Sequence, residues 1–229
     1  MRHSNWSRLR SIGMLDKIIS LFADDNATIS ASGRDNIKEY ISLLLKHDQT
    51  IKWTLHPLGF FHAASEVRIG LRIRLHIWPP TWTIPMDQRT GEIHDHIFEL
   101  NSFVLTGEVQ NEIFQEDVDA SSTHNLMDVS YADHKSLLVD KREQVALSTE
   151  SKRTYVSGQI YRMPSGKLHR TSALGSPTVT LVLADSSSSS LPARVAVPLG
   201  QTPPPPFSRR PLNTEEYGIV REILSLAIS

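Results

Sequence analysis

Apolar residues recur at every second position from about residue 51 onwards, and this spacing constrains the fold more than any other feature of the chain. In the clearest stretch, Val67–Trp78, positions 71, 73, 75 and 77 carry leucine or isoleucine, and the even positions from 72 carry arginine, histidine or tryptophan. Successive side chains of a strand point to opposite faces of a sheet, so we expect a strand with one buried face. Further runs of this kind are Ile93–Leu105, Glu108–Phe114, Tyr155–Met163, Thr178–Leu183 and Arg194–Val197.

The two ends of the chain follow a helical period instead. Apolar residues recur at helical spacing in Ser11–Ala23 and in Asn36–Lys46. Asp35 or Asn36 is expected to cap the second helix. A third helix is expected over Thr214–Ile228, with Asn213 as its cap and Glu216 completing a capping box. The fold class predicted is therefore an all-β antiparallel barrel with helical N- and C-terminal decorations.

We divide the chain into three parts. Residues 1–50 form an N-terminal helical extension, residues 51–200 the barrel, and residues 201–229 a Pro-rich loop with the C-terminal helix. Within the barrel, residues 115–153 are polar and weakly periodic, so they are interpreted as an insertion that could serve as an active-site lid. The terminal helices are expected to pack outside the barrel or to form a homodimer contact.

Composition excludes several classes of function. The net charge is −1 and charged residues make up 21% of the chain, which gives no electrostatic case for nucleic acid. No apolar run approaches the roughly 18 residues of a membrane span, and no secretory signal is evident, so a cytoplasmic location is expected. The chain has no cysteine, which excludes disulfides and thiolate ligands, and its 10 histidines leave imidazole as the obvious metal ligand.

Two histidines lie close together in the segment Gly91-Glu-Ile-His-Asp-His, and they are the first candidate site. In a strand, His94 and His96 share a face, so both imidazoles point the same way. A second candidate segment ends a strand in the turn Pro164-Ser-Gly, and His169 follows it. Proline presets φ for such a turn, and glycine supplies a positive φ where one is needed.

Together these two segments resemble the two motifs of the cupin superfamily. The second segment matches its glycine, five residues, Pro-x-Gly, two residues and histidine, and the first matches in its His-x-His pair and in Gly107, which closes the following hairpin. The resemblance covers roughly Arg72 to Leu183. It implies a cupin (jelly-roll) barrel that binds one metal ion through His94, His96 and His169.

The first motif departs from the cupin pattern at one position. Many cupins carry a metal-binding glutamate four residues after the second histidine, but here that residue is Leu100. The neighbouring Glu99 has the opposite strand parity and is expected to point away from the histidines. A site of three neutral imidazoles with open coordination positions suits Fe(II), with Ni, Zn, Mn or Cu as alternatives.

The residues around the histidines, Ile93–His96 and Leu168–Arg170, resemble the three-His thiol dioxygenases, of which cysteine dioxygenase is the familiar member. This resemblance implies Fe(II) as the cofactor. A thiol-bearing amino acid or thiol acid and O2 are the implied substrates, and the sulfur becomes a sulfinate. The crosslinked cysteine of some members cannot exist here, and neither the usual active-site tyrosine nor the carboxylate-binding arginine has an obvious counterpart.

Candidate substrate-binding residues come from two strands. Arg72, Arg74 and His76 share one face just before the first motif, where an arginine fork could hold a substrate carboxylate. The alternative is an exposed outer face, with His76 as a structural residue. Tyr161 is either a barrel-lining donor or a core tyrosine. Asp95 has the wrong parity for the metal and is expected in solvent.

The function favoured is a mononuclear non-haem iron dioxygenase acting on a small polar molecule. A metal-dependent lyase, isomerase or decarboxylase on the same scaffold remains open, as does a non-catalytic metabolite-binding cupin. The expected partners are a small-molecule substrate and O2, without nucleic acid or membrane, and a homodimer is an open alternative to a monomer.

Overall fold

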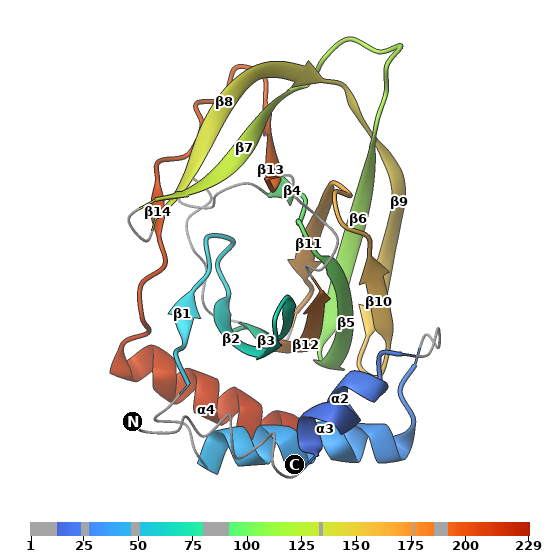
Figure 1. The fold of residues 1–229 in the computed structure, drawn as a ribbon, viewed down its shortest axis with the longest axis vertical. Helices are drawn as coiled ribbons and strands as arrows, with labels where there is room; N and C mark the ends of the chain where they lie inside the picture. Colours follow the sequence, from blue (N-terminus) through green and yellow to red (C-terminus); the bar gives the residue numbers. More distant parts are fainter. Residues whose placement is uncertain are drawn as a thin grey trace.

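The structure is a computed structural model, and it describes residues 13–23, 28–46, 51–79, 92–132, 135–175, 177–185 and 192–229. Its strands form two antiparallel sheets that face one another (Figure 1). The six-stranded sheet contains, in spatial order, β1 (Thr54–Leu55), β2 (Phe61–Arg68), β3 (Leu71–Trp78), β12 (Thr178–Asp185), β5 (Glu99–Thr106) and β10 (Ile160–Met163). The eight-stranded sheet contains β14 (Phe207–Ser208), β8 (Lys135–Val145), β7 (His124–Ala132), β13 (Arg194–Pro198), β4 (Ile93–His94), β11 (His169–Ala173), β6 (Glu108–Glu116) and β9 (Leu147–Val156). The predicted all-β antiparallel fold with helical N- and C-terminal parts is confirmed.

Helices α2 (Met14–Ser20), α3 (Ala31–Lys46) and α4 (Thr214–Ile228) lie together at one end of the molecule, below the six-stranded sheet (Figure 1). The predicted capping box of α4 is confirmed, because the Asn213 side chain accepts a hydrogen bond from the Glu216 backbone N–H and the Glu216 carboxylate accepts one from the Asn213 backbone N–H. None of the described helices is long and apolar enough to cross a bilayer.

The predicted start of α3 is wrong. The helix begins at Ala31, five residues before the predicted Asn36, so Asp35 and Asn36 lie inside it. The cap is Ser30, whose Oγ accepts a hydrogen bond from the backbone N–H of Gly33 at 3.1 Å. A serine in this position satisfies an N–H that has no partner within the helix.

The two faces of the six-stranded sheet have different roles, as the alternation of β3 predicts. Its leucines and isoleucines join the largest hydrophobic cluster, which also contains the buried residues of the helices. The opposite face carries Arg74 and His76, which pair across the ladder with Val182 and Thr180 of β12. Val182 belongs to a second cluster, with Phe98, Leu100 and Tyr161 among its members, inside the barrel. The face that carries Arg74 and His76 is therefore the barrel interior.

Three predicted strands are divided by turns or loops. The stretch Val67–Trp78 contains the turn between β2 and β3, where Gly70 has a φ of 80°. Tyr155–Met163 contains the end of β9, a turn and β10, and Ile93–Leu105 is interrupted at residues 95–98, between β4 and β5. In the first case Val67, Ile69 and Leu71 continue the apolar alternation across the break, so the alternation does not reveal the turn.

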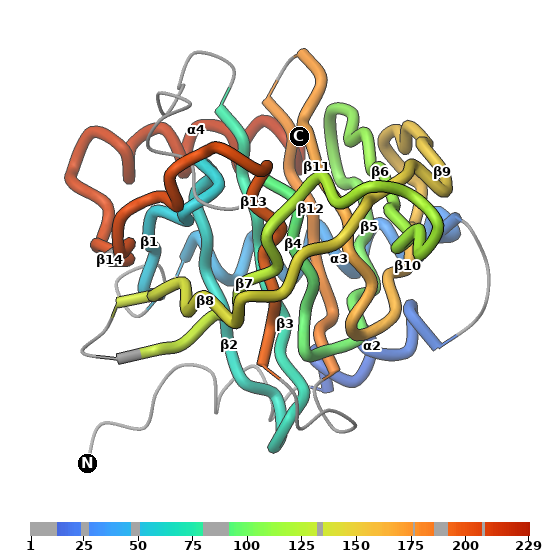
Figure 2. The backbone as a smooth tube through the Cα atoms, turned by 90° about the horizontal axis from the view of Figure 1, so that it is seen from above, coloured from blue at the N-terminus to red at the C-terminus, as the bar shows by residue number. Residues whose placement is uncertain are grey.

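Residues 115–153, interpreted from their polarity as an insertion, contain β7, β8 and most of β9. The hairpin of β7 and β8 lies at the end of the molecule opposite the helices (Figure 1), and in the view from above it crosses in front of β2 (Figure 2). Strand β8 alternates weakly because most of its side chains are exposed or half-buried. Its backbone pairing with β7, from His124 opposite Val145 to Ala132 opposite Lys135, determines its structure instead.

Gly107 closes the hairpin between β5 and β6 with a φ of 77°. A Cβ atom at this position would lie 2.3 Å from Oγ1 of Thr178 and 2.9 Å from the carbonyl oxygen of Pro177. The Thr178 hydroxyl is also hydrogen-bonded to the Glu108 backbone, so it is not free to move aside. The hairpin therefore requires glycine for its conformation and for its close contact with the start of β12.

We predict that Gly107→Ala destabilises the protein more than Gly200→Ala. Gly200 also has a positive φ, of 82°, but nothing lies within 4 Å of a Cβ added there. Left-handed backbone costs a non-glycine residue about 1 to 2 kcal/mol, and overpacking adds about 1 to 3 kcal/mol at Gly107 alone. Urea denaturation of the two variants measures the difference, and equal losses of stability would contradict the close contact.

Candidate metal centre

Three imidazoles converge inside the barrel from two segments that are far apart in the sequence. His94 ends β4, His96 follows in the loop, and His169 begins β11 directly opposite His94 in the ladder. One nitrogen from each ring lies within 4.8 Å of the others, and the ring centroids are 4.6 to 5.0 Å apart. This spacing is suited to a single ion between the rings.

Backbone carbonyl groups fix the orientation of two of these rings. The Nδ1 atom of His94 lies 3.3 Å from the carbonyl oxygen of Glu92, and Nδ1 of His169 lies 3.1 Å from that of Lys167. An Nδ1–H that donates to a carbonyl leaves Nε2 with a free lone pair, which is the tautomer that ligates a metal. Both rings are thus held with Nε2 available.

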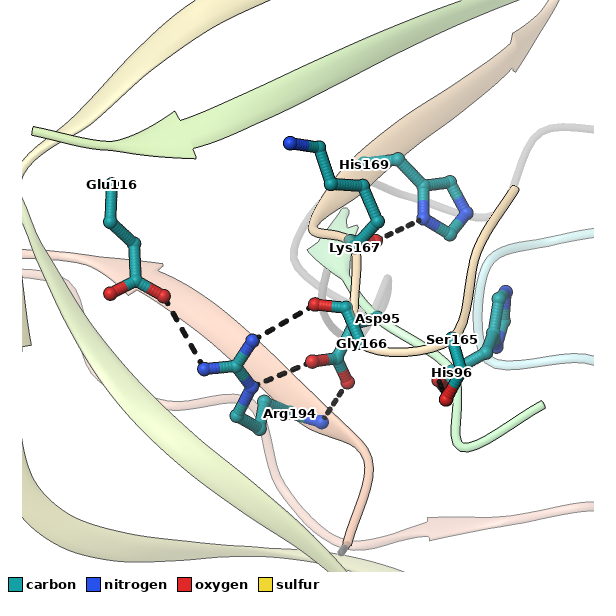
Figure 3. Close-up of polar contacts among 8 residues, drawn as sticks. All are labelled: Asp95, His96, Glu116, Ser165, Gly166, Lys167, His169 and Arg194. Carbon is teal, nitrogen blue, oxygen red and sulfur yellow. Dashed lines mark hydrogen bonds and ion pairs between the residues drawn. The ribbon is translucent and has the colours of Figure 1, made fainter. Parts of the chain in front are cut away.

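The turn of the second motif holds the backbone of the first. The carbonyl oxygen of His96 accepts a hydrogen bond from the Gly166 backbone at 2.8 Å and another from the Ser165 hydroxyl at 3.2 Å (Figure 3). Gly166 has a φ of 74°, which L-residues rarely adopt. The predicted Pro-Ser-Gly turn therefore fixes the position of one ligand, and His169, three residues later, supplies another.

Asp95, which separates the first two histidines, is not in solvent as predicted. Its side chain is 3% exposed and accepts hydrogen bonds from the Arg194 backbone at 2.5 Å and from Arg194 Nε at 2.6 Å. Arg194 also donates to the carbonyl oxygen of Gly166 at 3.0 Å (Figure 3). The prediction treated odd parity as exposure, but β13 covers that side of the segment.

Burial keeps His96 and His169 neutral. It lowers the pKa of His96 well below its ordinary value, with additional lowering from His94, His169, Arg74 and His76. It also lowers the pKa of His169 to about 3, although the hydrogen bond to Lys167 acts in the opposite direction. A neutral imidazole is the form that binds a metal, so no proton competes for the site near pH 7.

The remaining predicted residues fall into two groups. Glu99 is exposed and lies outside the histidine group, with its side chain accepting a hydrogen bond from Asn101. Arg72 is exposed and faces Glu66 across the ladder. In contrast, Arg74 lies 4.2 Å above the ring of Phe98, and this ring stacks on His96 at 4.6 Å. Arg74, not Arg72, therefore lies next to the histidine group.

His76 and Tyr161 both face the barrel interior. His76 lies between His62 and Trp78, with ring centroids at 5.4 and 5.8 Å, and it does not join the metal group. Tyr161 is buried, and its burial raises its pKa to about 12. It packs in the same cluster as Phe98, so it is a core tyrosine that lines the barrel.

Sequence reasoning missed Ser165, Phe98 and Arg194 as parts of this site. The serine carries no signal beyond its place in the turn. Phe98 lies two residues after His96, and in a continuous strand this spacing would have placed it on the same face. Arg194 lies about 100 residues from Asp95, and nothing local in the sequence indicates that pair.

No protein-family model matches the sequence, and no curated protein matches it. Among solved structures, oxalate decarboxylase from Bacillus subtilis matches at 17% identity with a TM-score of 0.35, over 62% of this chain and 29% of that chain. A cupin superfamily protein from Desulfitobacterium hafniense DCB-2 matches at 12% identity and TM-score 0.30, over 55% and 76% of the two chains. Hydroquinone 1,2-dioxygenase from Sphingomonas sp. TTNP3 matches at 11% identity with a TM-score of 0.33, over 53% of this chain and 63% of that chain.

We predict that His94→Ala, His96→Ala and His169→Ala each lose most of the bound metal. Protein purified without oxygen should hold about one ion per chain, and two remaining imidazoles bind it too weakly to keep it. Glu99→Gln is the control and should retain the metal. Elemental analysis measures the content, and full occupancy in the His169→Ala protein would exclude that residue from the site.

Acidification should destabilise the metal-free protein, in part through His62. Burial lowers the pKa of His62 to about 3, with further lowering from Arg74 and Arg209. As the pH falls below about 6.5, His62 takes up a proton in the unfolded chain, but in the folded protein it stays neutral until about pH 3. The free energy of unfolding therefore decreases as the pH falls from about 6.5 to about 3. One such proton changes the free energy of unfolding by up to about 1.4 kcal/mol per pH unit.

We predict that His62→Gln makes this pH dependence shallower by up to that slope. Urea denaturation between pH 7.5 and 5 measures it, with His124→Gln as the control because His124 is only half-buried. An unchanged slope in His62→Gln would mean that the residue titrates alike in both states.

Proposed function

We propose that this chain is a mononuclear non-haem iron dioxygenase that oxidises the sulfur of a small thiol-bearing amino acid or thiol acid. The observation that supports it most is the convergence of His94, His96 and His169, a group that contains no carboxylate from the described residues. Such a site leaves coordination positions open for other ligands. Fe(II) and the thiol follow from the resemblance of the surrounding residues to the three-His thiol dioxygenases.

The proposed reaction is balanced without a further reductant. One thiol and one O2 give one sulfinic acid, because both oxygen atoms are transferred to the sulfur, which loses four electrons as O2 gains four. When bound, Fe(II) supplies Lewis-acid and redox chemistry for O2 and sulfur. Imidazole binds a metal in its neutral form, so the three ligands leave the full positive charge of the ion for an anionic thiolate.

Arg74 is the side chain placed to orient a substrate carboxylate. Its guanidinium contacts the Phe98 ring, which in turn contacts His96. A guanidinium fork binds a carboxylate through two parallel hydrogen bonds, so it fixes the direction of the ligand as well as its position. Holding the substrate in one orientation beside the metal removes much of the entropic cost of the reaction.

The direct test is O2 uptake by protein loaded anaerobically with Fe(II) and supplied with cysteine or 3-mercaptopropionate. The proposal predicts thiol-dependent O2 consumption and a sulfinate product detected by mass spectrometry. Product formation without O2 uptake would instead indicate a metal-dependent lyase, isomerase or decarboxylase. Metal-dependent ligand binding without any product would indicate a metabolite-binding protein.

We predict that Arg74→Lys raises the substrate concentration needed for half-maximal turnover at least about tenfold, because lysine keeps the charge but loses the fork. Arg72→Lys is a matched control on the same strand face, and it should be silent because Arg72 is exposed. Metal content should be unchanged in both. An effect of Arg72→Lys equal to that of Arg74→Lys would contradict the assignment of the carboxylate contact.

A further inference from the structure

The barrel interior contains a second group of basic side chains beside the histidine group. His56, His62 and His76 contribute imidazoles, and Arg74 and Arg209 contribute guanidiniums; we call these five residues the basic cluster. The ring centroids of the histidines lie 5.4 to 6.5 Å apart. A nitrogen of Arg209 lies 3.5 Å from Nε2 of His56. The cluster joins strands β2 and β3 to the segment that follows β14.

Several donors of the basic cluster are buried without a partner among the described residues. They are Nε of Arg74, Nε of Arg209 and Nε2 of His62. Burial, together with repulsion from Arg209 and Arg72, lowers the pKa of Arg74 to about 10. Burial also lowers the pKa of Arg209. Two guanidiniums thus lie close together in the interior, and among the described ion pairs neither has a carboxylate partner.

Two other arginines, Arg194 and Arg210, each form an ion pair with a buried carboxylate. Arg194 is paired with the buried Asp95 at 2.6 Å, and Arg210 with Glu216 at 2.6 Å. A buried charge without a partner costs several kcal/mol, and the cost is removed when an opposite charge binds with good geometry. The unpaired guanidiniums of the basic cluster therefore indicate a ligand that carries the missing negative charge.

The same residues are unsuited to a second metal ion. Their imidazoles do not form a group with metal-binding spacing among the described residues. Two guanidinium charges would also repel a cation. Burial lowers the pKa values of His56, His62 and His76, with smaller contributions from neighbouring charges, so each ring is neutral at pH 7. Nε2 of His62 has no partner among the described residues and can donate one hydrogen bond to an anion.

We propose that the basic cluster binds an oxyanion with two negative charges, so that the thiol substrate of this site also carries a dicarboxylate or phosphate group. The inference rests on the proposed function in that Arg74 contacts Phe98, and Phe98 contacts His96 of the metal centre. Arg74 and Arg209 supply the two positive charges. His62 supplies a neutral donor, and the rings of Phe60 and Trp78, whose centroids are 4.8 Å apart, both pack against the ring of His76.

The test is calorimetric titration of the metal-free protein at constant ionic strength, which requires neither iron nor turnover. Succinate and inorganic phosphate are the doubly charged probes, and acetate is the singly charged one. The proposal predicts that one of the two dianions binds at one per chain and at least about tenfold more tightly than acetate. Tighter binding of succinate identifies a dicarboxylate, and tighter binding of phosphate identifies a phosphate group.

Arg209→Gln should weaken dianion binding by about tenfold to a hundredfold, because it removes one charge and its hydrogen bonds. Arg72→Gln, with the same change of charge on an exposed residue, is the matched control and should bind as the parent does. If Arg209→Gln does not fold, Arg209→Lys keeps the charge and should still weaken binding through loss of the fork.

Binding of neither dianion, or equal binding to the parent and to the folded Arg209 variant, would overturn the proposal. These results are independent of the proposed function, which would fail separately. A protein that binds succinate but does not consume O2 with any thiol keeps the anion site and loses the dioxygenase. A protein that oxidises thiols but binds no dianion keeps the dioxygenase and loses this inference.

Discussion

The hydrogen bonds between the turn at residues 164–166 and the carbonyl oxygen of His96 are the contact on which the candidate metal centre depends. They join two segments that are about 70 residues apart in the sequence, and each segment carries ligands of its own. Arg194 adds a third segment by donating to both Asp95 and the Gly166 carbonyl. Three stretches of chain are thereby fixed around one point, so the imidazoles are held in place by backbone contacts instead of by the metal alone.

A second constraint is that the two faces of the six-stranded sheet carry different side chains and have different roles. The terminal helices cover its apolar outer face, and this packing forms the largest core of the protein. The main hydrophobic core therefore does not depend on the inner face of this sheet. The inner face carries Arg74 and His76 in a place where buried charge would otherwise be costly. We interpret this unusual interior as the recognition surface for an anionic molecule next to the metal.

Local chemistry explains which features the sequence predicted well. The capping box of α4, the face of β3 and the turn before His169 each depend on residues within a few positions of one another, and such patterns are readable in the chain. The turn at Gly70 was missed because the apolar alternation of Val67, Ile69 and Leu71 runs through it. The burial of Asp95 and the role of Arg209 depend on strands from the far end of the chain. No periodicity within a segment indicates which distant strand will cover it.

The central claim is that one metal ion lies among His94, His96 and His169, and X-ray absorption spectroscopy of the Fe(II)-loaded protein tests it most directly. Coordinated imidazole rings produce a characteristic multiple-scattering pattern beyond the first shell of nitrogen and oxygen atoms. The account predicts a pattern that fits three imidazoles, with the remaining positions taken by water or substrate, and no change in it for Glu99→Gln. A spectrum that fits fewer than three imidazoles would contradict the account, as would a carboxylate ligand that disappears in that variant.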